Sequence, residues 1–416
     1  MKNSYRKIGL YLLASFLSKL VSFIFLPWFT KVLTPEDIGS INVFLGIISF
    51  VAPFIAFGTI ISISVEYYTA QKMNIHKNLI LTSLIFPLFF TLLTFIILIG
   101  LFFSGISFVL PYKLLFLIPI CAIANLFLEF LMLIYRLEDK LKSFFLFSIF
   151  KIIFEVFFTI YLLHTLGYEY ENRIYGIFIS YLIVILIFCY WFIKNDIFSG
   201  KFKLNLLKKE IKIGISTIFT MTNVFLIFTF DKLVISYLLG IYYTGIYSLA
   251  TSFSLIIIAV SSSLNNYFQT RIYSHLSYDI NSKLVFKEHK SYFLIITGFF
   301  VLIMLIIPLI FDYFIDPKFK SSLAIFYILN VSYYFWAINT ILMNILWFFK
   351  KNRIIRIVSF LSIVVFIPIL FFFTNKFGVF GTAFVILSLV LLQVCVSLYF
   401  VNKINCRFLG FKLKKK

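Results

Sequence analysis

Long apolar runs recur along the whole chain and constrain its fold more than any other feature. Twelve of them are each near twenty residues long, the length that an α-helix needs to cross the hydrocarbon core of a bilayer. Membrane-spanning strands alternate apolar and polar residues over roughly ten positions, whereas these runs are continuous. We therefore predict an all-α integral membrane protein with spans at residues 8–30, 38–64, 79–103, 113–135, 143–164, 174–193, 213–237, 244–266, 292–315, 322–349, 355–373 and 379–402.

The charged residues agree with this prediction. They make up only 13% of the chain, whereas soluble domains carry roughly 25% to keep their surface hydrated. The net charge of +21 comes from short clusters of Lys and Arg between the apolar runs. Because these clusters do not form one basic face, we interpret them as topology signals and predict no nucleic-acid partner.

The distribution of basic residues predicts an orientation. When the span-end residues Lys113 and Arg356 are counted with the adjoining loops, 28 of the 37 Lys and Arg residues lie in the two tails and the even-numbered loops, and 6 lie in the odd-numbered loops. The other three, Lys19, Lys151 and Lys232, lie within predicted spans. Since Lys and Arg accumulate in cytoplasmic loops, we expect both termini to be cytoplasmic.

A weak internal repeat indicates two halves. A shift of 206 residues places Leu33 on Leu239 and Gly39 on Gly245, with a span, a short outward turn and another span in each copy. Turns that end in Gly are common, so chance similarity is the alternative. The repeat predicts two six-helix bundles around a central cavity: an N-terminal bundle with its connecting loop at 1–200, a C-terminal bundle at 201–402, and a basic cytoplasmic tail at 403–416.

Polar residues follow one face of the first span. Ser15, Ser18, Lys19 and Ser22 recur at helical spacing, with Lys19 near the middle of the membrane. A central charge rarely faces lipid, so Ser15, Lys19 and Ser22 are candidates for a substrate cavity. The alternative is a structural pair between Lys19 and a carboxylate of a neighbouring helix.

The fifth span carries a second polar stripe. Lys151 and Glu155 lie four residues apart, between Ser148 and Thr159. Residues at this spacing can form an ion pair with each other; contact with cargo or with an ion is the other interpretation. Glu129 in the fourth span is either an interfacial carboxylate or a partner for Lys151.

Further candidates lie in the seventh and eighth spans. Asn223 and Asp231 belong to one polar stripe, and Thr251 belongs to another. Hydroxyl and amide groups at helical spacing can line a polar path through the membrane, or they can hold helices together. As a buried carboxylate, Asp231 could also exchange H⁺ or Na⁺.

Motifs for ATP hydrolysis and metal catalysis are missing from the sequence. It contains neither a G-x-x-x-x-G-K-[ST] loop nor an H-E-x-x-H motif. We predict no enzyme activity, no cofactor and no metal site. Any energy for transport would come from an ion gradient, of H⁺ or Na⁺, or from the concentration of cargo.

Two segments carry a resemblance to a known family. LPWFTKVLTPEDIG (26–39) and DKLVISYLLGIYYTGIYSLA (231–250) resemble the corresponding segments of bacterial polysaccharide flippases, the Wzx-type O-antigen translocases of the multidrug/oligosaccharidyl-lipid/polysaccharide exporter superfamily. The resemblance implies a flippase of the bacterial inner membrane. It would move a polyprenyl-pyrophosphate-linked oligosaccharide from the cytoplasmic to the outer leaflet by alternating access. Membrane lipids and other polysaccharide-assembly proteins are the further partners implied.

Two other functions stay open at this point. A related exporter of the same superfamily could carry a drug, a teichoic-acid-type precursor or a peptidoglycan precursor. A membrane-embedded glycan polymerase or ligase is the alternative from another class, and it would present a sizeable outward loop. The outward loops predicted here are all short, which favours transport.

Overall fold

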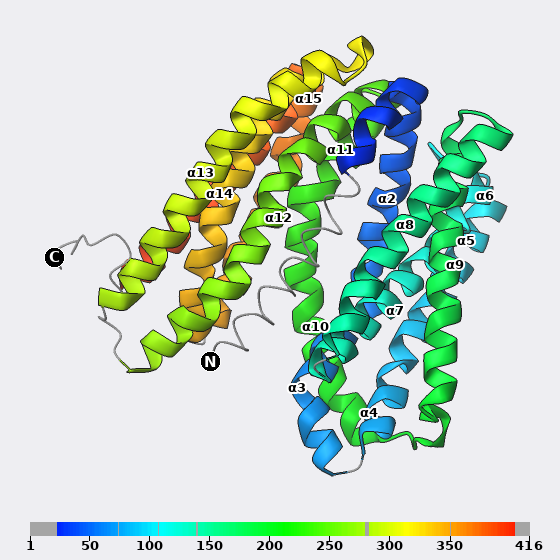
Figure 1. Cartoon of the computed structure of the whole chain (residues 1–416), viewed down its shortest axis with the longest axis vertical. Helices are drawn as coiled ribbons and strands as arrows, with labels where there is room; N and C mark the ends of the chain where they lie inside the picture. The colour runs from blue at the N-terminus through cyan, green and yellow to red at the C-terminus, as the bar shows by residue number, and fades with distance from the viewer. Residues whose placement is uncertain are drawn as a thin grey trace. The chain divides into compact units, whose positions relative to one another are not determined.

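The computed structural model describes residues 23–73, 75–106, 108–138, 140–278, 283–349 and 351–403. Their long elements are all α-helices, which confirms the predicted all-α fold class (Figure 1). The described chain divides into two compact units. Unit 1 is formed by Glu36–Ser236, and unit 2 by Leu26–Pro35 and the chain from Tyr237 onward.

Unit 1 contains long helices joined by short helical turns. Its elements are α2 (Pro35–Ala56), α3 (Thr59–Lys72), α4 (His76–Ser83), α5 (Ile85–Phe103), α6 (Tyr112–Leu115), α7 (Ile118–Leu137), α8 (Leu141–Leu166), α9 (Tyr170–Lys194), η1 (Ile197–Ser199), α10 (Leu204–Phe225), the π-helical turn η2 (Leu226–Phe230) and α11 (Asp231–Leu238).

The predicted span at 38–64 is broken between α2 and α3. Phe57 and Gly58 both have positive φ, 39° and 76°, a conformation that ends a right-handed helix. At this break the chain touches α10, because a Cβ on Gly58 would lie 2.8 Å from the Cα of Gly214. Any side chain at Gly58 or Gly214 would clash with the opposite backbone, so this crossing requires glycine at both positions.

Aromatic and small residues hold α7, α8 and α9 together. The buried rings of Phe127 on α7 and Phe188 on α9 stack with centroids 3.9 Å apart. Nearer the start of α9, a Cβ at Gly176 would lie 2.7 Å from the backbone of Thr159 on α8. The missing side chain thus lets the two backbones approach closely, as in many membrane helix pairs.

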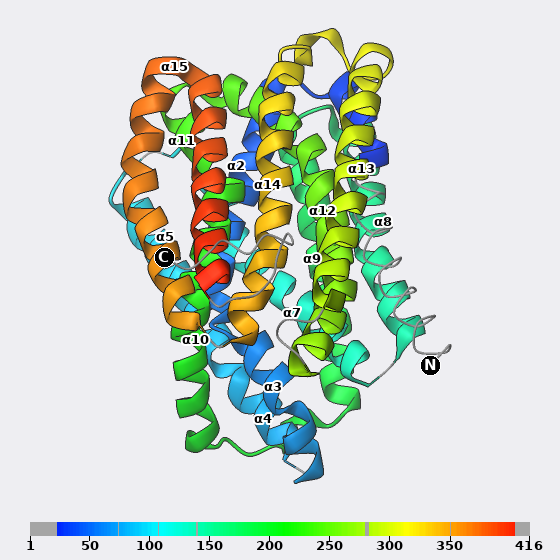
Figure 2. The same cartoon turned by 90° about the vertical axis from the view of Figure 1, so that its left-hand side faces the viewer.

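Unit 2 consists mainly of very long helices. They are α12 (Ile241–Tyr278), α13 (Lys283–Tyr313), the short turn η3 (Pro317–Phe319), α14 (Ser322–Phe348) and α15 (Asn352–Lys403). Helices α12, α13 and α14 pack against one another (Figures 1 and 2).

Helix α15 turns back on itself at one residue. Gly378 has a non-helical backbone with φ 62° and ψ −149°, and Figure 2 shows the orange and red arms of α15 on either side of this bend. The hydroxyls of Thr374 and Thr382 form a hydrogen bond of 2.9 Å across it. The bend separates the predicted spans 355–373 and 379–402.

Nine helices in the described ranges are long and apolar enough to cross a membrane. Eight of them each overlap one predicted span, and the ninth, Val364–Lys403, overlaps the last two. The predicted span at 8–30 lies mostly outside the described residues, 213–237 is divided among α10, η2 and α11, and the last two predicted spans are joined in α15. A multi-pass all-α fold is therefore confirmed, and the count of twelve spans stays a prediction.

The boundary between the two packing units differs from the boundary that the repeat predicts. Unit 1 extends to Ser236 and so includes α10, whereas the repeat places its boundary between 200 and 201. Packing and repetition are separate properties of a chain, so the domain boundaries derived from the repeat also stay a prediction.

Candidate functional site

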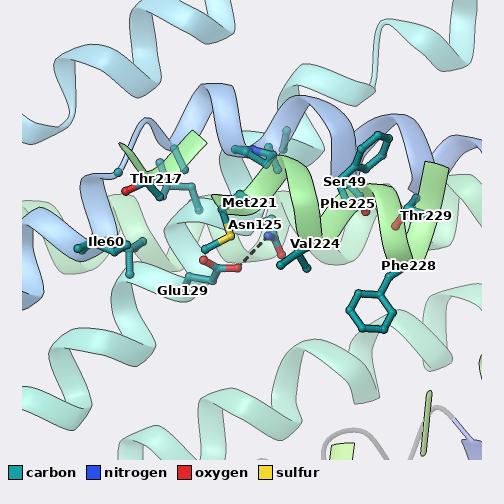
Figure 3. Close-up of a pocket in the computed structure, with 17 residues that line it drawn as sticks. Ser49, Ile60, Asn125, Glu129, Thr217, Met221, Val224, Phe225, Phe228 and Thr229 are labelled. Atoms are coloured by element: carbon teal, nitrogen blue, oxygen red, sulfur yellow. Dashed lines mark hydrogen bonds between the residues drawn. The ribbon is translucent and has the colours of Figure 1, made fainter. Parts of the chain in front are cut away.

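A cavity of about 340 Å³ lies inside unit 1. Its wall is formed by α2, the start of α3, α7, α10 and η2, and most of it is apolar. The polar side chains that line it are Ser49, Asn125, Glu129, Thr217 and Thr229 (Figure 3). A mostly apolar pocket with a few convergent polar groups is the usual form of a binding site.

Glu129 and Asn125 form the polar centre of this cavity. They lie one turn apart on α7, and the Asn125 Nδ2 donates a hydrogen bond of 3.3 Å to the Glu129 Oε1. Figure 3 shows this pair beside the Met221 side chain of α10. The Glu129 side chain is exposed, although α7 is mostly buried, because it lines this cavity.

The cavity offers hydrogen bonds without positive charge. Among the described residues that line it, Glu129 is the one with a charged side chain. Carboxylate, amide and hydroxyl groups together accept and donate hydrogen bonds to sugar hydroxyls or amides. A diphosphate in this cavity would face a carboxylate instead of a cation, so the geometry favours the uncharged part of a cargo.

The structure brings Lys151 and Glu155 together on α8. They form an ion pair, and their side chains are 14% and 24% exposed. Glu129 does not take part in this pair and instead accepts a hydrogen bond from Asn125. Glu129 is therefore not the partner of Lys151 in this structure, and its interfacial position in the membrane stays a prediction.

Two residues of α9 complete the charged cluster. The Lys151 Nζ lies 4.4 Å from the centre of the Tyr181 ring, and Arg173 interacts electrostatically with Glu155. We call Lys151, Glu155, Arg173 and Tyr181 the α8–α9 cluster. With two cations and one carboxylate, it carries a net positive charge. The sequence did not indicate Arg173 or Tyr181, because a helix-to-helix contact leaves no spacing pattern along the chain.

Asp231 begins α11 and is fully buried. Its Oδ1 accepts a hydrogen bond of 2.8 Å from the backbone N–H of Lys232. Lys232 is buried too and interacts electrostatically with Asp231. The π-helical turn η2 directly precedes this pair, and such turns occur frequently at functional sites.

The remaining candidates from the sequence lie elsewhere. Lys19, Ser15 and Ser22 lie outside the described residues, and the structure describes the backbone of Asn223 in α10 but not its side chain. Thr251 belongs to unit 2, where it is fully buried and donates a hydrogen bond of 2.8 Å to the Tyr247 carbonyl. Their roles in transport stay predictions.

Several polar residues of unit 2 connect its helices. The Tyr292 hydroxyl donates to the Ala337 carbonyl at 2.9 Å and bonds the Ser261 hydroxyl at 2.8 Å. The Asn344 amide donates to the Asn265 Oδ1 at 2.6 Å. Ser261 and Asn265 therefore both take part in contacts between helices.

Comparison with solved structures identifies the fold. The lipid II flippase MurJ in an inward closed conformation has a TM-score of 0.71 and 17% identity, covering 94% of this chain and 87% of that one. The multidrug transporter DinF-BH in complex with R6G has a TM-score of 0.66 and 14% identity, with 96% and 94% covered. An outward-facing MATE transporter of the MOP superfamily has a TM-score of 0.64 and 14% identity, with 98% and 96% covered. The chain thus has the fold of the MOP-superfamily transporters.

Comparison with sequence families is more specific. The family described as "Polysaccharide biosynthesis protein" matches residues 4–270, which is more than half of the chain. The chain belongs to this family, and the resemblance to the Wzx-type proteins of the MOP superfamily is confirmed. No curated protein matches the chain.

Proposed function

We propose that this MOP-superfamily transporter of polysaccharide biosynthesis is a flippase for a polyprenyl-pyrophosphate-linked oligosaccharide, an O-antigen or similar repeat unit. It moves the cargo from the cytoplasmic to the outer leaflet of the bacterial inner membrane by alternating access. The observation that carries the proposal is the family match over residues 4–270. The similarity of fold to a lipid II flippase supports it, since lipid II and the proposed oligosaccharide cargo are both linked to a lipid.

The cavity of unit 1 supports the proposal through its chemistry. Sugars bind by hydrogen bonds from carboxylate, amide and hydroxyl groups, and the Glu129–Asn125 pair with the nearby hydroxyls provides these. The apolar remainder of the wall suits the non-polar faces of sugar rings. We assign the glycan part of the cargo to this cavity.

The diphosphate requires positive charge from another part of the protein. A pyrophosphate in hydrocarbon is prohibitively costly without cations or water. The α8–α9 cluster has a net positive charge, and Lys19 is the second cationic candidate. We therefore retain Lys19, Lys151 and Glu155 as transport residues, together with the candidates Ser15, Ser22, Asn223, Asp231 and Thr251.

Lys19 provides a direct test of the diphosphate assignment. Lys19→Ala should abolish glycan export while the protein is inserted at its normal level, and Lys19→Arg should retain part of the export. Normal export by Lys19→Ala would make the residue structural or dispensable.

The proposed architecture has twelve spans in two six-helix halves with both termini in the cytoplasm. A reporter that is active only outside the cytoplasm should be active when fused after Gly167 and silent when fused after Gly200. Activity at Gly200 with silence at Gly167 would contradict the orientation.

The substrate is tested by deletion in the native host. Loss of the protein should leave a lipid-linked glycan on the cytoplasmic leaflet, and its isolation would identify the cargo. Restoration by the wild-type chain and by an exposed-site variant such as Tyr313→Phe serves as the control. Accumulation of a peptidoglycan precursor would instead favour the related exporter, and unchanged lipid-linked pools would contradict the flippase.

A further inference from the structure

Glu210 is a buried carboxyl at the point where three helices of unit 1 meet. It lies in the second turn of α10 and is 1% exposed. The Thr59 Oγ1, at the start of α3, donates a hydrogen bond of 3.1 Å to the Glu210 Oε1. Ser83 at the end of α4 lies beside them, and its carbonyl accepts a hydrogen bond of 3.2 Å from the same Thr59 hydroxyl. Figures 1 and 2 both show α3, α4 and the start of α10 together at one end of the unit.

The hydrogen bonds at this site are too few for a charged carboxylate. Thr59 has one hydroxyl hydrogen, which it shares between Glu210 and the Ser83 carbonyl. Although the Ser83 hydroxyl also lies close, the Glu210 Oε2 makes no hydrogen bond among the described residues. A buried charge without full hydrogen bonding is costly, whereas a neutral carboxylic acid is much less so.

The charged groups around the site do not neutralise Glu210. On α3 the nearest is Glu66, which is negative and pairs with Lys209 of α10 at 3.0 Å. Tyr67 of the same helix donates its hydroxyl to Glu138. On α4 the titratable side chains belong to its first turn, where Lys77 pairs with Asp196 at 3.0 Å and His76 begins the helix.

Burial is the main cause of an altered acidity at this position. Burial, with a smaller contribution from the negative charge of Glu66, raises the pKa of Glu210 to about 8 against the opposing effect of the nearby Thr59 and Ser83 hydroxyls. Glu210 precedes the predicted span at 213–237 and so lies outside the predicted membrane-spanning segments. The carboxyl therefore changes its charge within the range of pH that a cell meets.

The position of Glu210 gives this titration a structural consequence. Gly214 lies four residues further along α10, and a Cβ there would lie 2.5 Å from the Phe57 carbonyl oxygen at the α2–α3 break. Gly58 and Thr217, on the two sides of this crossing, also line the cavity that contains Glu129. Glu210 therefore lies one helical turn from the α2–α3/α10 crossing at the end of the cavity.

We propose that Glu210 is a proton-binding site that latches α10 to the α2–α3 break and to α4. With the proton bound, the neutral carboxyl stays buried and the joint is closed. When the proton leaves to bulk water, the carboxylate must be hydrated, so α3 and α4 separate from α10. The step needs no other reactant, and it does not depend on which cargo the transporter carries.

The distance between α3 and α10 can be measured in the full-length protein without cargo. Spin labels are attached at Gln71→Cys on α3 and Asn205→Cys on α10, after Cys121, Cys189, Cys395 and Cys406 are replaced. Both label positions are exposed. Double electron–electron resonance should give one distance population at about pH 6 and a second, longer one at about pH 10, with a midpoint near the pKa of Glu210.

Three variants make the result specific. Glu210→Gln should keep the short distance at every pH. Thr59→Val should move the midpoint to higher pH, because it removes a hydrogen bond that favours the charged form. Glu66→Gln, the matched carboxyl of the same joint, should keep the transition and move its midpoint slightly lower, because a negative neighbour is lost.

Two outcomes would overturn the proposal. One is a distance distribution of the parent protein that does not change with pH. The other is the same pH response in the Glu210→Gln variant. If Glu210→Gln does not fold, the direction of the Thr59→Val shift decides alone, and an unmoved midpoint contradicts the latch. None of these outcomes tests cargo transport, so a failure here leaves the proposed flippase function intact.

Discussion

The two units of this protein use their interior polar groups differently. Unit 1 contains ionisable side chains in the cavity, at the α3–α4–α10 joint and in the α8–α9 cluster. In unit 2 many of the buried polar groups are hydroxyls and amides that bond across helices, such as Tyr292 with Ala337 and Ser397 with Asn339. The buried Glu288 of unit 2 is paired with Arg271 at 3.0 Å.

This difference separates two roles of polar residues inside a membrane protein. Ionisable groups are expensive in hydrocarbon and are usually retained for function. Neutral hydrogen bonds between helices cost less and mainly hold the helices together. We therefore expect substitutions in unit 1 to change transport, and conservative substitutions in the unit 2 network to change stability.

The largest effect is expected at Lys151. Lys151→Met removes the ion-pair partner of the partly buried Glu155 carboxylate and leaves only Arg173 near it among the described basic residues. Because breaking a buried pair costs about 3 to 5 kcal/mol in soluble proteins, the level of folded protein should fall. The double variant Lys151→Met/Glu155→Met should recover the folded level but not glycan export. Protein level and export, measured in both single variants and the double variant, decide this. Restored export in the double variant would make the pair purely structural.

The next effect concerns the cavity. Glu129→Gln removes a charge that can accept hydrogen bonds from cargo, and bonds to charged groups are worth about 1.5 to 3 kcal/mol. Export should therefore fall by about tenfold or more at an unchanged protein level. Glu138→Gln, at the end of the same helix and outside the cavity, is the matched control. Equal export by both variants would remove the glycan from this cavity.

A smaller effect is expected in unit 2. Tyr292→Phe removes the hydroxyl that bonds Ala337 and Ser261 and should destabilise the protein by about 1 to 3 kcal/mol. The thermal midpoint should decrease while export per folded molecule is unchanged. Tyr313→Phe on the same helix, where the side chain is 78% exposed, should leave both unchanged. A transport defect specific to Tyr292→Phe would contradict the division of roles.

The smallest effect is expected at an exposed pair of unit 1. Lys77 and Asp196 lie 3.0 Å apart, and the hydrogen bond from Lys77 lowers the pKa of Asp196. Any stabilisation is therefore present at neutral pH and is lost as the pH falls through the acid range. Because solvent screens exposed pairs, Lys77→Gln should leave the thermal midpoint unchanged at neutral pH. A clear decrease would show that the pair holds α4 to η1.

The local sequence determined those features that depend on residues close together along the chain. Continuous apolar runs predicted membrane helices, because each helix satisfies its own backbone hydrogen bonds and needs only lipid around it. The spacing of Lys151 and Glu155 made an ion pair one of two interpretations of the sequence, since one helical turn separates them. The segments at 26–39 and 231–250 were sufficient to indicate the family.

Only the tertiary structure decided which side chains meet from different helices. Arg173 and Tyr181 joined Lys151 and Glu155 because α8 and α9 approach closely at Gly176. Glu129 became a cavity residue, and Glu210 met Thr59 and Ser83, because the chain breaks at Phe57 and Gly58 and crosses α10 there. Such contacts depend on how helix axes pack in three dimensions, and the periodicity of one helix contains no information about its neighbour.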